Sequence, residues 1–195
     1  MLKPASLREH LTAALPQLRR DPEKLVVFIT GGGLHSTLTQ SLSFEYRYTL
    51  RLLLLDYAGH ADAVMAPLLI WLRTHQPDLL DNPEKRAKSL RFEAEHLSTT
   101  TMDLVIELDL TERVLARPRD GTPGGLNLVH IAEPPSVLLH TPAGRVPTPY
   151  DPLEPADAND PAASGAEPRE HWSIWLSDEM LAEWEHDPRP PAIAG

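Results

Sequence analysis

Residues 41–57, SLSFEYRYTLRLLLLDY, alternate apolar and polar side chains along most of their length. Side chains of a β-strand point to opposite faces with a period of two, so one face of this segment is apolar and the other is polar. The apolar face holds Leu42, Phe44, Tyr46, Tyr48, Leu50, Leu52 and Leu54. The polar face holds Ser41, Ser43, Glu45, Arg47, Thr49 and Arg51. Such a strand needs a core behind its apolar face, and water or another subunit in front of its polar face.

Two helices are predicted around this strand. Apolar residues at helical spacing predict a helix over residues 6–20, opened by a capping box of Ser6 and Glu9 and kinked or split at Pro16. The same spacing predicts a second helix over residues 61–75.

Further strands are predicted downstream. A polar loop is expected over residues 77–86, followed by alternating segments over residues 89–97 and 102–114 that predict an antiparallel pair of strands. A short edge strand is expected over residues 126–131. The order of elements predicts an α+β domain with helices packed on one face of a mostly antiparallel sheet.

Three consecutive glycines, Gly31 to Gly33, follow the strand-like run at residues 24–30. A phosphate-binding loop needs a lysine and a wider glycine spacing, and TGGGLHST has neither. Glycine tolerates the positive φ of tight turns, so the sequence favours a hairpin turn that leads into the long strand.

The composition excludes several classes of site. The chain has 195 residues, of which 42% are hydrophobic, enough for one ordinary core. It has no cysteine, and its nine histidines show no paired ligand spacing, so no metal or other cofactor is expected. No apolar run is long enough to predict a membrane span. The net charge of −10 argues against sequence-specific or coating interactions with nucleic acid. We therefore expect a soluble, cytoplasmic protein.

Charge and proline divide the chain near residue 133. Residues 1–133 hold 17 acidic and 15 basic residues, whereas residues 134–195 hold 11 acidic and 3 basic residues and 12 of the 20 prolines. This predicts a folded domain over 1–133, a Pro-rich acidic linker over 134–170, an amphipathic docking segment over 171–187 and a disordered tail over 188–195.

The docking segment contains three of the four tryptophans. We expect it to form a helix that Ser177 could cap, with docking anchors Trp172, Trp175, Met180 and Trp184. An exposed stripe of this kind favours aggregation, so the segment should be docked. An intermolecular site is favoured, and docking on its own domain is the alternative.

Opposite charges project from the polar strand faces. The candidate interface residues are Glu45, Arg47, Arg51, Asp103, Glu107 and Asp109. Ion pairs within one sheet contribute up to about 1 kcal/mol each, whereas pairs across a subunit interface would select the partner and fix its register. The sequence leaves both arrangements open. Carboxylates two residues apart could also serve acid/base chemistry, but no nucleophile accompanies them and a solvated or interfacial face is favoured.

Four stretches resemble the phage tail completion protein R family of temperate contractile-tailed phages. They are SLSFEYRYTL (41–50), WLRTHQPDLLDNPEKR (71–86), FEAEHL (92–97) and LTERV (110–114), in the order of the family. The resemblance covers about residues 1–133 and implies a virion structural protein, with no enzymatic residues.

The resemblance also implies a place and partners. The protein is expected to cap the head-proximal end of the tail, end growth of tube and sheath, and prepare the tail for joining to the head. Analogy with other tail terminators implies a hexameric ring that contacts tube, sheath and head-tail connector proteins. A head-to-tail adaptor at the capsid portal is the alternative within this class, and a hydrolase acting through the acidic strand face is the alternative outside it.

Overall fold

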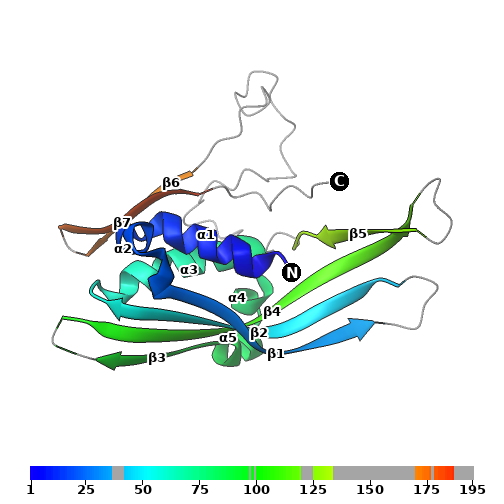
Figure 1. Ribbon diagram of the computed structural model, residues 1–195, viewed down its shortest axis with the longest axis horizontal. Helices are drawn as coiled ribbons and strands as arrows, with labels where there is room; N and C mark the ends of the chain where they lie inside the picture. The colour runs from blue at the N-terminus through cyan, green and yellow to red at the C-terminus, as the bar shows by residue number, and fades with distance from the viewer. Residues whose placement is uncertain are drawn as a thin grey trace, which may run out of the picture.

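The computed structural model describes residues 1–36, 42–96, 98, 100–119, 125–133, 170–176 and 178–186. Its centre is an antiparallel sheet in the order β1-β2-β4-β3, and β5 pairs with β4 beyond the end of β3 (Figure 1). The strands are β1 (Leu25–Ser36), β2 (Phe44–Tyr57), β3 (Leu90–His96), β4 (Met102–Pro118) and β5 (Leu126–Ile131). The predicted α+β class is confirmed.

The core lies between the sheet and two helices, α1 (Lys3–Ala14) and α3 (Ala61–His75). Burial alternates strictly along β2 and β4, so the even-numbered residues from Tyr48 to Leu54 and from Leu104 to Leu110 are buried. Complete burial of one such leucine contributes about 1.5–3 kcal/mol. The expected apolar face does not extend to Leu42, which is 68% exposed. We call the opposite, odd-numbered side of β2, β3 and β4 the open face.

The helix expected over 6–20 is split at Pro16 into α1 and α2 (Pro16–Arg20), as predicted. A short 3-10 helix, η1 (Pro22–Lys24), leads into β1. The predicted capping box is wrong because α1 begins at Lys3 and Ser6 lies within it. Its hydroxyl instead accepts a hydrogen bond from Trp71 Nε1 at 3.1 Å, which ties α1 to α3.

The polar loop expected over 77–86 is also wrong, since it folds as α4 (Asp78–Asp81) and α5 (Pro83–Ser89). Asn82 separates the two helices, and its Oδ1 accepts hydrogen bonds from the amides of Glu84 at 2.9 Å and Lys85 at 3.4 Å. An Asn cap followed by proline at the first helical position is a strong helix start.

The glycines do not form the expected turn. β1 continues through Gly31, Gly32 and Gly33, which pair with β2 after a bulge between Ile29 and Gly31. The antiparallel hairpin itself is confirmed, with Ser36 opposite Phe44.

The C-terminal segment expected to be a helix is instead a hairpin of β6 (Glu170–Leu176) and β7 (Glu179–His186). The prediction was wrong because the three-residue spacing of Trp172 and Trp175 fits a helix, whereas a strand accommodates it with an irregularity after Ile174. The pairing of Trp172 with Trp184 across the hairpin is a contact between residues that no helical period contains. β7 contacts α1 (Figure 1). Except for Glu170, the predicted linker over 134–170 lies outside the described residues, as do Ser177 and the predicted tail over 188–195.

Candidate assembly interface

The open face brings most of the predicted interface residues together as ion pairs within one sheet. Arg51 lies opposite Glu107 in the β2–β4 register, with nitrogen and oxygen 3.7 Å apart. Thr49 donates a hydrogen bond to Asp109 at 2.7 Å. These contacts favour the arrangement within one sheet for Arg51, Glu107 and Asp109.

Arg91 of β3 completes this group, and the sequence reasoning missed it. Its guanidinium lies 3.4 Å from Glu107 and 3.1 Å from Asp109. The hydrogen bond with Asp109 raises the pKa of Arg91 above its usual value. Arg91 shares the polar face of its predicted strand with two glutamates, so aligning β3 with β4 would have identified it.

Asp103 supports the fold of β2. Its Oδ1 accepts a hydrogen bond from the amide of Asp56 at 2.9 Å. Asp56 has a φ of 46° and lies in the irregularity between Leu54 and Tyr57. Asp103 therefore stabilises the irregularity of β2 at Asp56 and is not part of the group formed by Arg51, Arg91, Glu107 and Asp109.

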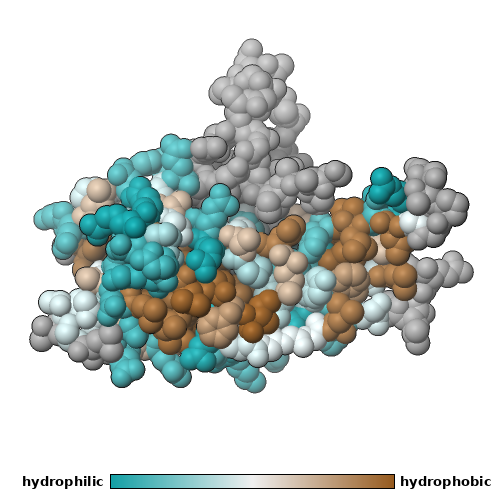
Figure 2. Space-filling model, viewed as in Figure 1, coloured by the Kyte–Doolittle hydropathy of each residue, from teal (hydrophilic) through white to brown (hydrophobic). Residues whose placement is uncertain are grey.

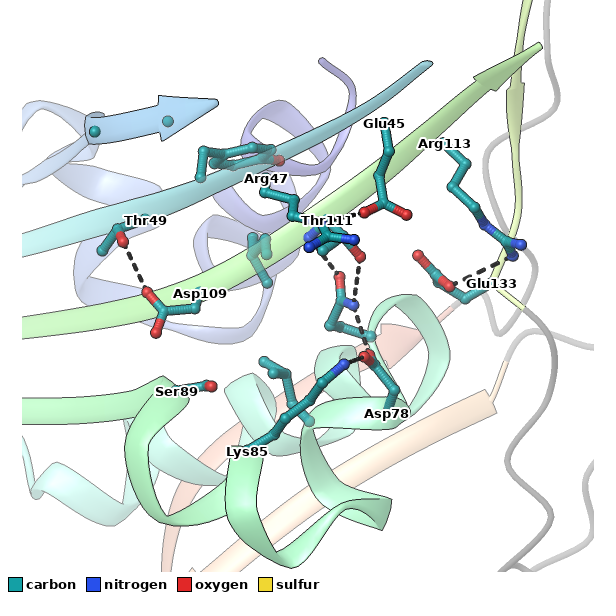
Figure 3. Close-up of a pocket in the computed structure, with 16 residues that line it drawn as sticks. Glu45, Arg47, Thr49, Asp78, Lys85, Ser89, Asp109, Thr111, Arg113 and Glu133 are labelled. Carbon is teal, nitrogen blue, oxygen red and sulfur yellow. Dashed lines mark hydrogen bonds and ion pairs between the residues drawn. The ribbon is translucent and has the colours of Figure 1, made fainter. Parts of the chain in front are cut away.

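Glu45 and Arg47 lie at the other end of the open face, where they form an ion pair on the same strand. They line an open groove of about 800 Å³ between β2, β4 and the α4–α5 region (Figure 3). Asp78 and Lys85 form an ion pair on its opposite wall. The Arg47 side chain remains 58% exposed, so of the predicted charges it is the one best placed to meet a neighbour.

A buried polar cluster lies beside this groove, at the start of α1. Glu112, 4% exposed, accepts hydrogen bonds from the amide of Leu2 at 2.7 Å, the amide of Lys3 at 3.3 Å and the hydroxyl of Tyr48. His130 Nδ1 lies 3.2 Å from the same carboxylate. A carboxylate at a helix N-terminus satisfies free amides and is favoured by the helix dipole.

Lys3 lies beside the part of β4 that pairs with neither β3 nor β5. Its ammonium donates to the Thr111 carbonyl at 2.7 Å, to Gln76 at 2.6 Å and to Glu133 at 2.9 Å. Gln76 accepts in turn from the Thr111 amide at 3.1 Å. Side chains thus satisfy the backbone of β4 where neither strand reaches it.

Burial and hydrogen bonding shift three pKa values in this region. Burial lowers the pKa of Lys3, although Glu133 and Glu112 oppose the shift. Burial raises the pKa of Tyr48, and its hydrogen bond to Glu112 adds to the shift. Burial also acts to raise the pKa of Asp78, but hydrogen bonds from Lys85 and Gln76 outweigh it and the pKa is lowered.

The model of the P2 phage tail completion protein R (GpR) family matches residues 1–134. The chain belongs to this family. Tail completion protein R of Escherichia phage P2 is 42% identical over 135 residues, which cover 69% of this chain and 85% of that protein. No solved structure matches the chain.

Membership in the tail completion protein R family confirms a structural role in phage tail assembly rather than an enzymatic one. Of the two carboxylate pairs considered for acid/base chemistry, Glu93 with Glu95 and Glu107 with Asp109, the second is held by Arg51, Arg91 and Thr49. Within the described ranges, no group of three or more acidic or histidine side chains could hold a metal ion. In the same ranges, no helix has the length and apolar character to cross a membrane.

The predicted docking anchors lie beyond the residues that match the tail completion protein R family. Trp184 is 4% exposed and packs edge-on against His10 of α1, with ring centroids 5.8 Å apart. Trp172 packs partly against the same core. By contrast, Trp175 is 57% and Met180 47% exposed, opposite each other near the end of the hairpin. The anchors therefore separate into an inner pair docked on the same chain and an outer pair facing away.

Proposed function

We propose that this chain caps the head-proximal end of a phage tail as a hexameric ring, ends growth of the tube and sheath, and prepares the tail to join the head. The observation that carries the proposal is membership in the tail completion protein R family over residues 1–134. Assembly takes place in the host cytoplasm, and the protein remains in the virion at the upper end of the tail.

The geometry of the sheet supports a ring subunit. A closed ring requires a heterologous contact, in which two different surfaces of each copy meet. The helices bury one face of the sheet, while the open face presents Arg47 and the groove beside it to solvent. The sheet path begins at β1 and ends at β3, so it offers two different edges, one for each neighbour in a ring.

The proposed partners follow from this position. The ring contacts its own copies, the last layer of tail tube and sheath proteins, and the head-tail connector proteins. Sequence-specific contact with nucleic acid is not part of the proposal, because the chain carries a net charge of −10 and phosphate contacts require lysine and arginine.

Imaging of tails from a phage that makes no capsids tests the proposal. A terminator is expected on these free tails, as six copies in a ring at one end, with tails of uniform length. Tails from a strain that lacks the protein should vary in length. If the protein is absent from free tails but present on complete virions, it is an adaptor at the capsid portal and the terminator proposal fails. A ring of another symmetry contradicts the six-fold part.

A further inference from the structure

Strand β1 is an edge strand without the usual protection against pairing. Its sequence, LVVFITGGGLHS, contains no lysine, arginine, aspartate, glutamate or proline, the residues with which proteins commonly guard edges. Within the described residues it pairs with β2 alone. Val26, Phe28, Ile29 and Leu34 are 37%, 43%, 36% and 62% exposed. Figure 2 shows apolar surface along this side of the sheet, interrupted by a nearly neutral stretch.

The three glycines of β1 differ in what the subunit itself requires. A Cβ at Gly32 would meet Tyr48 Cβ at 3.0 Å and the Arg47 carbonyl at 3.1 Å, so the fold has no room for a side chain there. A Cβ at Gly31 would have nothing within 4 Å, and one at Gly33 would meet only the His35 ring at 3.6 Å. Neither has a positive φ. Glycine inside a strand lowers the stability of the fold by about 0.5–1 kcal/mol relative to alanine. Because the subunit itself does not require glycine at these two positions, we look for a contact outside it, and close approach of another backbone commonly requires glycine.

We propose that the β1 edge pairs with strand β3 of a second copy of this chain, which extends the sheet from subunit to subunit. This inference rests on the proposed ring and identifies its contact. Adjacent strands run antiparallel from β1 through β2 and β4 to β3. A second copy in the same orientation therefore brings its β3 antiparallel to β1, with its helices on the same side of the sheet.

The side chains of β1 and β3 are complementary. On the helix side, β3 exposes 60% of Phe92, which would cover Leu34 of β1, itself 62% exposed, when Glu93 lies opposite Gly33. On the open face, β3 carries Arg91, Glu93 and Glu95. Arg91 is already held by Glu107 and Asp109, so the glutamates would repel each other if β3 paired with another β3. Pairing with uncharged β1 avoids this repulsion.

Gly33 gives the partner's glutamates access to Arg47. Gly33 lies directly opposite Arg47 in the β1–β2 register, and both lie on the open face. Strands are spaced about 4.8 Å apart, so a glutamate on the far side of β1 would lie about 10 Å from Arg47 between backbones. Two long side chains span this distance if the residue between them has no side chain. Arg47, which pairs with Glu45 in the free chain, thereby gains a second partner in the assembly.

Valine substitutions test the contact in the full-length chain. Gly31→Val and Gly33→Val should leave the urea unfolding free energy of the free chain unchanged or higher, because the space is open and valine favours strands. Both should lower the amount of the chain on tails at least about tenfold, equivalent to about 1.4 kcal/mol of contact energy. Gly32→Val is the control for damage to the fold, and it should lower the unfolding free energy. If both open-site variants assemble normally, the inference is overturned.

Cross-linking on tails identifies the pairing strand, because the natural chain has no cysteine. A full-length double variant, Leu34→Cys with Phe92→Cys, places the two thiols directly opposite each other in this register and should give a ladder of multimers with a short bismaleimide, whereas each single variant should give no dimers. Dimers from Leu34→Cys alone would show β1 paired with β1 and overturn the inference. A ring seen by imaging without cross-links would overturn it while leaving the proposed function intact. Absence of a ring would refute both.

Hydrogen exchange tests whether a segment of the same chain, rather than a second copy, covers the β1 edge. In the free full-length chain, the outward amides of β1 should exchange rapidly, and on tails they should become protected. Protection already present in the free chain would show that the chain covers its own edge, which would overturn the inference.

Discussion

Glu112 is a charged residue at a core position, and its partners make it tolerable there. Burial of a carboxylate is costly unless hydrogen bonds and opposite charges compensate. Two backbone amides at the start of α1 and the hydroxyl of Tyr48 supply those hydrogen bonds. The residue therefore joins the first turn of the chain to the centre of β4.

Replacing Glu112 with alanine should destabilise the fold strongly. The change leaves two amides and one hydroxyl without their acceptor in a buried site, so we expect a loss of roughly 3–5 kcal/mol in the urea unfolding free energy. The matched control is Glu107→Ala, because Glu107 is partly exposed and such ion pairs contribute at most about 1 kcal/mol. Similar losses for both variants would contradict the assigned role of Glu112.

The raised pKa of Tyr57 predicts that the fold loses stability in alkaline solution. Burial raises its pKa from 10.0 to about 12. Between these values the unfolded chain releases the phenolic proton and the folded chain keeps it, so the unfolding free energy should fall as pH rises from 10 to 12. In Tyr57→Phe this part of the slope should disappear, which unfolding measurements at several pH values would detect. An unchanged slope would refute the assignment.

At the scale of elements, the β6–β7 hairpin has one docked and one outward part. Ala182 and Trp184 belong to the core cluster, while Trp175, Leu176 and Met180 are 57%, 42% and 47% exposed near its end. The docked part covers α1 of the same chain. Contact of the exposed part with another molecule stays a prediction.

The two tryptophans should differ sharply in their effect on stability. Trp184→Ala removes a buried ring that packs against His10, so we expect a loss of about 3 kcal/mol in unfolding free energy. Trp175→Ala changes a mostly exposed side chain and should alter stability by less than about 0.5 kcal/mol. Urea titrations followed by far-UV circular dichroism avoid dependence on the tryptophan signal itself. Equal effects would contradict the docking of β7 on α1.

The sequence predicted correctly those elements whose hydrophobic periodicity agrees with the residues that begin and end them. The long alternations of β2 and β4 are unambiguous, and Pro16 split the first helix as expected. The hairpin at the C-terminus was missed because its tryptophans fit a period of 3.6, and the irregularity after Ile174 interrupts the period of two in the strand. Gly31 to Gly33 were misassigned because glycine is equally consistent with a turn and with close approach of a backbone.

The candidate site was predictable where it depends on strand faces and not where it depends on distant segments. Alternation alone placed Arg47, Arg51 and Glu107 on the open face. The residues that donate hydrogen bonds to Glu112 lie more than 60 residues away along the chain, and no local pattern contains that information. Glu112 occupies an inward position in its strand, which is the one signal that could have identified it.

At the scale of the whole molecule, Arg47 is expected to act in assembly rather than in folding. The side chain is 58% exposed and pairs within its own strand with Glu45. Arg47→Glu should therefore leave the unfolding free energy within about 1 kcal/mol of the natural value but reduce incorporation into tails. Arg19→Glu, an exposed change of equal charge on α2, is the matched control and should assemble normally. Normal assembly of Arg47→Glu would show that this charge makes no subunit contact.

The C-terminal extension poses the remaining question, because residues beyond 134 lie outside the family match. Deletion of residues 134–195 retains the whole sheet, helices α1 to α5 and the ion pair between Lys3 and Glu133. We expect the shortened chain to fold cooperatively and stay soluble, with a lower unfolding free energy because Trp184 no longer covers α1. Its tails should be unstable or fail to join heads.

A full-length variant separates the two roles of the extension. Trp175→Ala combined with Met180→Ala removes the outward anchors and keeps the docked face, so its unfolding free energy should match that of the natural chain while its tails show the defect of the deletion. Aggregation or unfolding of the deleted chain would show that the extension is an integral part of the core. Normal head joining by the double variant would place the function of the extension elsewhere than in the exposed end of the hairpin. Aromatic side chains held on a short hairpin suit such a contact, since they bury a large area on binding at a small cost in side-chain entropy.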